Sequence, residues 1–525
     1  MSLSIHHGTT PQPLRRLCPD SLKASLPLIY ILLWTGINLL FLTSFPFVHT
    51  DEPWLSGLSR SMMEAGSPQV TEDFFDLYPR QPHAVKILFH GLQILFIQIF
   101  GYSLGTVRLL SLLGGSLSLA LFYRLALRIL PDKNRKGPAL AATIALSLDI
   151  QFLYTAHLAR QEIFMVLLSL GVFNLLFSQR KPLLRGALSG GVLGLSSGFH
   201  PNVFLIAWPA GLFLLSEILR RRRSPQEGVS FLLAAAAGAV PFILLSFLFN
   251  PQFLQDYAAY GRPLGVLDTP DIKLLHWPGF YRKLFFQIGG TYETPPLQLT
   301  LAAFPIVLII ALFRGRGRLG LLGLIGFNVG LILLGKYSPP SIIILFPFFY
   351  LLVAELLDHP VATRIFPLFL AALLIISSWE ILHESFRKEE SFAEYTETLN
   401  RNIPPGSAAL GSLYAEYALS DGALYNWRNL PYLQEKGISL KKYIRDRGIT
   451  YVILPDELDY IYQRRPYWNV LYGNPSFWYP ALKRLLKENG TLIESWESPV
   501  YAMRIDAYRQ LSPWRVRIYK LSTKE

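Results

Sequence analysis

Long apolar runs alternate with short polar connections along most of this chain. A bilayer crossing takes about 20 apolar residues, with about 17 as a minimum. Eleven runs reach or approach this length, the fifth being short, at roughly 25–45, 104–130, 138–156, 162–179, 184–199, 201–219, 229–250, 297–313, 319–335, 341–358 and 362–383. The pattern predicts a polytopic α-helical membrane protein with about 11 transmembrane helices.

One further apolar stretch, 84–101, differs because it carries Lys86, His90 and Gln93. If it does not cross and the N-terminus is cytoplasmic, every strongly basic loop falls on the cytoplasmic side, as the positive-inside rule requires. If it crossed, nearly all of these clusters would lie outside. We therefore expect a multi-pass protein of the plasma (inner) membrane, with 84–101 as a surface helix. The clusters are Lys133, Arg135 and Lys136; Arg180, Lys181 and Arg185; Arg220 to Arg223; and Arg314, Arg316 and Arg318.

Composition agrees with a membrane protein. Of 525 residues, 51% are hydrophobic and 16% charged, against about 25% charged in soluble chains. The net charge of +13 then reflects basic cytoplasmic loops and does not indicate nucleic acid. The single cysteine, Cys18, excludes an internal disulfide framework and a cysteine-based zinc site.

This topology places three segments outside: a loop at 46–103, a loop at 251–296 and the end of the chain from 386. The last segment has mixed charge, a strand-like run at 449–454 and a helix-like run at 440–447. Its length of about 140 residues suits one small α/β domain. We expect a transmembrane domain over 1–385 and an extracytoplasmic α/β domain over 386–525.

The first outer loop opens with two adjacent acids in His49-Thr50-Asp51-Glu52-Pro53-Trp54. Apolar residues then recur at helical spacing up to Gly66, which predicts an amphipathic helix on the membrane surface. The acids have a plain alternative role, because carboxylates near a helix N-terminus often only cap it or offset its dipole.

Polar side chains also gather at the predicted outer ends of other spans. A carboxylate base beside cations suits attack by a hydroxyl on a sugar whose leaving group is phosphate. The alternatives are lysines that snorkel to the interface, a structural pair of Arg160 with Glu162 and an ordinary loop histidine at His200. These side chains are Arg80, His83 and Lys86; Arg160 and Glu162; His200 and Asn202; and Lys336 and Tyr337.

The order of these motifs resembles the start of the GT-C glycosyltransferases. It runs from a span to Asp51-Glu52, a helix ending at Gly66, Pro82, a second apolar helix ending at Gly101, and Val107-Arg108-Leu109 opening a span. The most similar group is the protein O-mannosyltransferase and aminoarabinose-transferase superfamily, the glycosyltransferase 39/83 type. Arg160 with Glu162, and Lys336-Tyr337 before proline, resemble its later motifs. The resemblance covers roughly 25–385.

The resemblance implies an inverting enzyme that takes a sugar from a polyprenyl-phosphate carrier at the outer face and passes it to a lipid, glycan or protein hydroxyl. Asp51 would be the catalytic base or a carboxylate that orients the acceptor, with Glu52 in support. Donor-phosphate candidates are Arg80, Lys86, Arg160 and Lys336; substrate-binding candidates are His83, Glu162, His200, Asn202 and Tyr337. No cofactor is specified, and a divalent metal stays open. The alternatives are a secondary transporter and a membrane assembly protein without catalysis.

Overall fold

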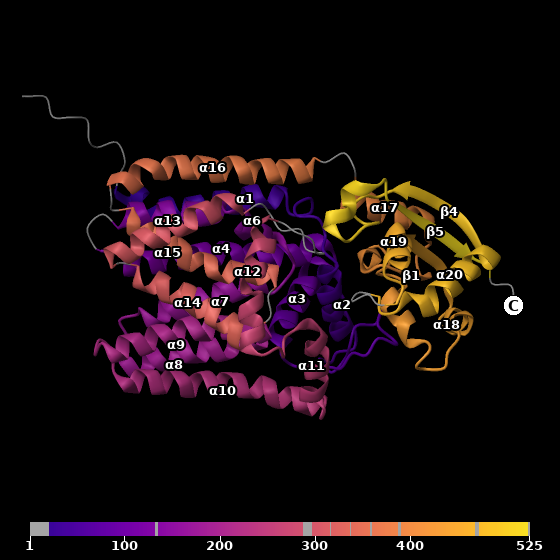
Figure 1. Cartoon of the computed structure of the whole chain (residues 1–525), viewed down its shortest axis with the longest axis horizontal. Helices are drawn as coiled ribbons and strands as arrows, with labels where there is room; N and C mark the ends of the chain where they lie inside the picture. Colours follow the sequence, from indigo (N-terminus) through magenta and orange to yellow (C-terminus); the bar gives the residue numbers. More distant parts are fainter. Residues whose placement is uncertain are drawn as a thin grey trace, which may run out of the picture.

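The computed structural model describes residues 20–131, 135–286, 297–315, 317–335, 338–357, 360–386, 390–467 and 472–522. A helical bundle occupies one part of the molecule, and a sheet with its covering helices lies at one end of it (Figure 1). The bundle consists of α1 (Asp20–Leu40), α4 (Leu104–Ile129), α5 (Lys136–Leu148), α6 (Ile150–His157), α7 (Glu162–Leu176), α8 (Pro182–Leu195), α9 (Phe204–Leu219), α10 (Pro225–Phe249), α13 (Gln298–Arg314), α14 (Arg318–Leu333), α15 (Phe346–Leu356) and α16 (Pro360–Ser385).

Every predicted span contains helix, but fewer helices than expected have the length of a crossing. Among the described residues, five helices are long and apolar enough to cross a membrane, or six if α5 and α6 form one span. The predicted count of about 11 is therefore not confirmed. Breaks inside apolar runs shorten the helices: α5 and α6 meet at 64°, where the Asp149 carboxylate accepts the N–H of Gln151 in place of a helical carbonyl.

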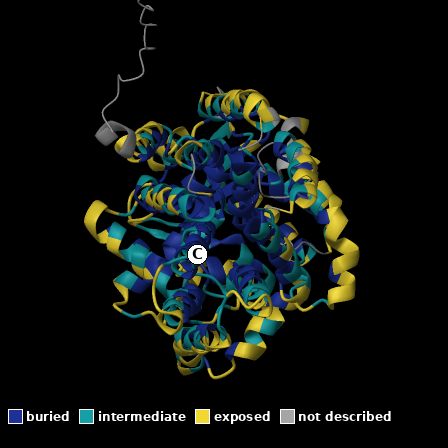
Figure 2. Ribbon diagram, turned by 90° about the vertical axis from the view of Figure 1, so that its left-hand side faces the viewer, coloured by how far each residue is buried: buried dark blue, intermediate teal, exposed yellow. Residues whose placement is uncertain are grey.

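Outward-facing apolar side chains cover the outer helices of the bundle. Leu232, Leu244 and Leu248 of α10 and Leu368 and Ile375 of α16 are all exposed. Viewed along the bundle, exposed positions ring a buried centre (Figure 2). Because so broad an exposed apolar surface is incompatible with water, the bundle is embedded in a membrane.

Two short helices lie between the bundle and the sheet (Figure 1). They are α2 (Asp51–Glu64) and α3 (Ile87–Phe100), as the apolar spacing predicts. The polar residues of α3 are explained by their contacts, since buried His90 and Gln93 both hydrogen-bond the Ser59 hydroxyl of α2, at 2.8 and 2.7 Å. The segment 251–296, expected as a loop, contains α11 (Phe253–Gly261) and α12 (Pro270–Phe286).

The end of the chain forms a five-stranded mixed sheet of order β2-β1-β3-β5-β4. Strand β1 pairs in parallel with β2 and β3, and β5 pairs antiparallel with β3 and β4. The expected strand and helix in this segment are confirmed as β3 and α18. The elements are β1 (Ala408–Gly411), β2 (Ala423–Asn426), β3 (Ile449–Pro455), β4 (Gly490–Glu497), β5 (Arg515–Leu521), α17 (Phe392–Asn402), α18 (Leu440–Asp446), α19 (Asp456–Arg464) and α20 (Pro475–Asn489).

The segment 46–103 completes the hydrophobic core on one side of this sheet. Phe47, Val48, Phe74 and Phe75 of that loop are buried in the same cluster as Ile453 of β3. Burial of four large apolar side chains contributes about 1.5–3 kcal/mol each. The sheet therefore holds the loop that carries the acid pair.

Helices α8 and α10 pack backbone to backbone through three glycines spaced four residues apart. A Cβ atom on Gly186, Gly190 or Gly194 would overlap a backbone carbonyl oxygen of α10, that of Phe231 in the case of Gly190. Small residues at such spacing allow close helix approach in membranes.

We expect Gly190→Ala to lower the free energy of unfolding by about 1–3 kcal/mol, because the backbone of α10 must move away from the new methyl group. The neighbouring substitution Gly191→Ala is the control, since its Cβ would meet nothing within 4 Å. Thermal unfolding in detergent compares the two variants. Equal midpoints would contradict this account of the contact.

Candidate active site

A buried ion pair fixes the start of α2. Glu52 and Arg108 are both 0% exposed, and the Arg108 guanidinium donates to both Glu52 carboxylate oxygens at 2.8 Å. The remaining donors of Arg108 bond the carbonyl oxygens of Leu42, Phe45 and Pro46. All five N–H groups of the guanidinium are thereby used.

The Glu52 carboxylate is equally saturated. Besides the two bonds from Arg108, it accepts the backbone N–H groups of His49 at 3.0 Å and Ala159 at 2.9 Å. The bond from His49 means that Glu52 does cap the helix start in part. With four hydrogen bonds and no exposure, its oxygens are not available to a substrate.

Unlike Glu52, the preceding residue Asp51 has a partly exposed carboxylate. Its side chain is 24% exposed and forms an ion pair with Arg160. Arg160 also binds both oxygens of Glu162, at 3.1 and 2.7 Å. The expected local pair of Arg160 and Glu162 therefore exists, and it extends to Asp51, so that one guanidinium orients two carboxylates.

Three more of the predicted residues surround this pair. Lys86 lies close enough to Asp51, Glu162, Arg80 and Arg160 to interact with their charges. Burial, followed by Arg80 and Arg160, lowers the pKa of Lys86 to about 8. Among the described residues its ammonium has no hydrogen-bond or ion-pair partner. Burial, followed by Lys86 and Arg80, lowers the pKa of His83 to about 4, so its ring is neutral at pH 7.

Arg80 forms an ion pair with Glu72, a residue that the sequence analysis did not select. Its guanidinium binds both oxygens of Glu72, at 3.1 and 3.0 Å. The Trp54 indole N–H donates to the same carboxylate at 2.5 Å, and the ring lies 5.3 Å from the Arg80 guanidinium. Glu72 carries no motif signal; only its position eight residues before Arg80 in the same loop could have indicated the pair.

Of the four remaining predicted residues, the structure describes two, His200 and Asn202. His200 is near enough to Glu162 to interact with its charge, and its Nδ1 accepts the N–H of Asn202. The side-chain amide of Asn202 donates a hydrogen bond of 3.3 Å to the hydroxyl of Ser341. Ser341 lies in the 3-10 helix η4 (Pro339–Leu345). Lys336 and Tyr337 lie outside the described residues.

The C-terminal segment also contributes side chains that the sequence analysis did not select. The Arg428 guanidinium lies 4.4 Å from the Trp54 ring, and Arg504 donates to the Thr50 hydroxyl at 3.4 Å. Each lies more than 370 positions along the chain from the residue that it contacts, Trp54 or Thr50, which left no local signal. Within the described ranges, no group of three or more His, Cys, Asp or Glu could hold a metal ion.

This combination of a helical bundle, two short surface helices with an acid pair, and a C-terminal α/β part is the GT-C fold. No protein-family model matches the chain, and no curated protein sequence matches it. Solved structures do. ArnT from Cupriavidus metallidurans superposes with a TM-score of 0.56 in its apo state (13% identity, 85% of this chain and 95% of that one). Bound to undecaprenyl phosphate it gives 0.58 (12% identity, 95% and 99%).

The oligosaccharyltransferase of Archaeoglobus fulgidus in its apo form is a second structural neighbour, with a TM-score of 0.50 and 11% identity over 91% of this chain and 74% of that one. The resemblance stated from the motifs is thus confirmed at the level of the fold. Because the identities are this low, the likeness concerns the fold.

We expect Arg108→Met to lower the free energy of unfolding by about 3–5 kcal/mol, because Glu52 would remain buried without its counter-charge. Arg124→Met is the matched control, since Arg124 lies on the same helix but is exposed. Unfolding of both variants in detergent, followed by size exclusion, measures the difference. Wild-type stability in Arg108→Met would refute the structural role of the pair.

Proposed function

We propose that this chain is an inverting glycosyltransferase that moves a hexosyl or pentosyl group from a polyprenyl-phosphate carrier to a hydroxyl of a lipid, glycan or protein acceptor. One observation carries the proposal: the partly exposed Asp51 carboxylate stands beside Lys86, a cation with no partner among the described residues. The fold shared with ArnT, whose structure holds undecaprenyl phosphate, supports a lipid-linked donor.

In the proposed step, the acceptor hydroxyl attacks the anomeric carbon on the face opposite the phosphate. The new carbon–oxygen bond forms as the bond to the phosphate oxygen breaks, which inverts the anomeric centre. Asp51 takes the hydroxyl proton in the transition state. The bond from Arg160 orients the Asp51 carboxylate, and Glu52 supports it by anchoring the first turn of α2 through Arg108.

Lys86 is the best candidate to meet the charge that develops on the departing phosphate. Arg80 and Arg160 each form an ion pair with a carboxylate. Their contribution to phosphate binding is therefore mainly the positive electrostatic potential that they add to the site. We also propose Lys336 as a further phosphate ligand. The proposed substrate-binding residues are His83, Glu162, His200, Asn202 and Tyr337. The placement of the basic loops supports a reaction at the outer face, with the C-terminal domain extracytoplasmic.

We expect Asp51→Asn to reduce sugar transfer by about 10²–10⁴-fold, the usual contribution of a general base. The variant should still fold and bind undecaprenyl phosphate, since Arg160 keeps its bonds to Glu162. Transfer from a polyprenyl-phosphate-sugar donor, measured on purified protein, tests this.

Asp73→Asn is the control for that experiment, because Asp73 is an exposed carboxylate of the same loop. It should transfer at the wild-type rate. Full activity of Asp51→Asn would eliminate the proposed base.

The pKa of Lys86, about 8, predicts a pH dependence for donor use. The ammonium is charged below this value, so kcat/KM for the donor should be high at pH 7 and fall as the pH rises through about 8. In Lys86→Arg the guanidinium stays charged above pH 12, so the fall should disappear. An unchanged pH profile in this variant would exclude Lys86 as the phosphate ligand.

A further inference from the structure

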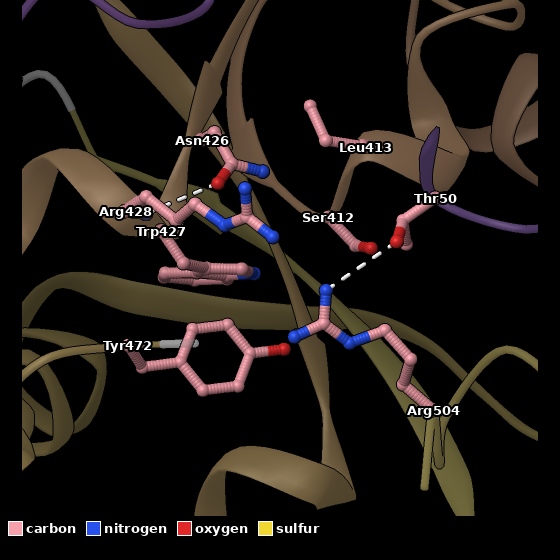
Figure 3. Close-up of a pocket in the computed structure, with 8 residues that line it drawn as sticks. All are labelled: Thr50, Ser412, Leu413, Asn426, Trp427, Arg428, Tyr472 and Arg504. Carbon is pink, nitrogen blue, oxygen red and sulfur yellow. Dashed lines mark hydrogen bonds between the residues drawn. The ribbon is translucent and has the colours of Figure 1, made fainter. Parts of the chain in front are cut away.

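A second cluster of cations, from the C-terminal segment, also lies near the N-terminus of α2. It borders a small pocket, lined among others by Thr50, Ser412, Asn426, Arg428, Tyr472 and Arg504. In the close-up, the guanidinium groups of Arg428 and Arg504 point toward one another and toward the hydroxyl groups of Ser412 and Tyr472 (Figure 3). None of these residues has a part in the proposed sugar transfer.

Arg504 lines this pocket, and some of its N–H donors have no hydrogen-bond partner among the described residues. It is 5% exposed. Its Nη1 reaches the Thr50 hydroxyl at 3.4 Å, and its Nε lies 3.8 Å from a Glu457 oxygen, beyond hydrogen-bond distance. Within the described residues, Nε and Nη2 are buried and have no hydrogen-bond partner. Such buried donors are costly unless a ligand or water meets them.

Arg428 adds a second charge that lacks a carboxylate. In the part of the chain that the structure describes, its side chain has no ion pair and no hydrogen bond; it contacts the rings of Trp54 and Phe75. Burial, and then the like charge of Arg504, lower the pKa of Arg428. The nearby carboxylates are Glu457, 3.8 Å from Arg504, and Asp51, whose charge acts on both arginines. Among the described residues neither carboxylate accepts a hydrogen bond from the guanidinium of Arg428 or Arg504. The two facing arginines therefore leave a positive site that an anion would complete.

We propose that Arg428 and Arg504 bind an anionic group, a phosphate or a carboxylate, carried by the acceptor next to the hydroxyl that is glycosylated. This inference rests on the proposed function. Thr50, which Arg504 contacts, is adjacent in the chain to Asp51, and the Asp51 carboxylate is near enough to both arginines to interact with their charges. The carrier phosphate is the ligand proposed above for Lys86. A second phosphate on the donor is the other source of the same chemistry.

Binding of inorganic phosphate to the purified full chain, saturated with undecaprenyl phosphate, tests the proposal by calorimetry. The carrier lipid occupies the donor site, so any phosphate that still binds reports the second site. We expect Arg428→Gln and Arg504→Gln to weaken phosphate binding at least about tenfold, each charge-assisted contact being worth roughly 1.5–3 kcal/mol. Their affinity for undecaprenyl phosphate should stay at the wild-type value.

Arg484→Gln is the matched control, because Arg484 is an exposed arginine on α20 of the same segment; it should bind phosphate as the wild type does. Arg428→Lys should retain part of the affinity through its charge. Size exclusion checks that all variants are folded.

Three results would overturn the proposal. They are absence of phosphate binding once undecaprenyl phosphate is bound, equal phosphate affinity in Arg428→Gln and the wild type, and loss of undecaprenyl phosphate affinity in Arg428→Gln, which would assign the site to the donor. Lys86→Gln separates the two ideas: it should weaken undecaprenyl phosphate binding and leave phosphate binding intact. If Lys86→Gln binds undecaprenyl phosphate as tightly as the wild type does, the assignment of Lys86 to the donor site is wrong. Phosphate binding that depends on Arg428 would still support the second site.

Discussion

The buried pair of Glu52 and Arg108 is the interaction on which the rest of the site depends. It joins four parts of the chain: the end of α1 through carbonyls, α2 through Glu52, α4 through Arg108, and the turn before α7 through the N–H of Ala159. An ion pair without solvent contact is stable only when its remaining hydrogen bonds are satisfied. Here all five guanidinium donors are used, so the geometry of the α2 start has little freedom.

This constraint also separates two adjacent acids that look equivalent in the sequence. Successive residues of a helix point about 100° apart, since a turn takes 3.6 residues. With Glu52 held inward by Arg108, Asp51 must face outward, toward Arg160 and Lys86. The saturated acid positions the accessible one.

Much of the architecture was predictable from hydrophobic spacing. The helices α2 and α3, strand β3 and all the apolar segments follow from local periodicity. The number of crossings did not follow, because a polar residue such as Asp149 bends a run that remains apolar in composition. The cation–carboxylate cluster around Asp51 was predicted because its members stand at the outer ends of apolar runs. Glu72, Arg428 and Arg504 were not, since their relation to Asp51 exists only after the chain has folded.

The arrangement of charge around Asp51 explains why the C-terminal segment belongs to the site. Arg80 and Arg160 each form an ion pair with a carboxylate, whereas Lys86 and Arg428 have no ion pair among the described residues. Trp54 contacts both Arg80 and Arg428. The loop between α1 and α3 is held from both directions, by Arg108 from the bundle and by the sheet's hydrophobic core through Phe47 and Phe74. Because Lys86 and Arg428 are both near enough to interact with the charge of Asp51, the region around this carboxylate has the charge distribution to hold anionic groups.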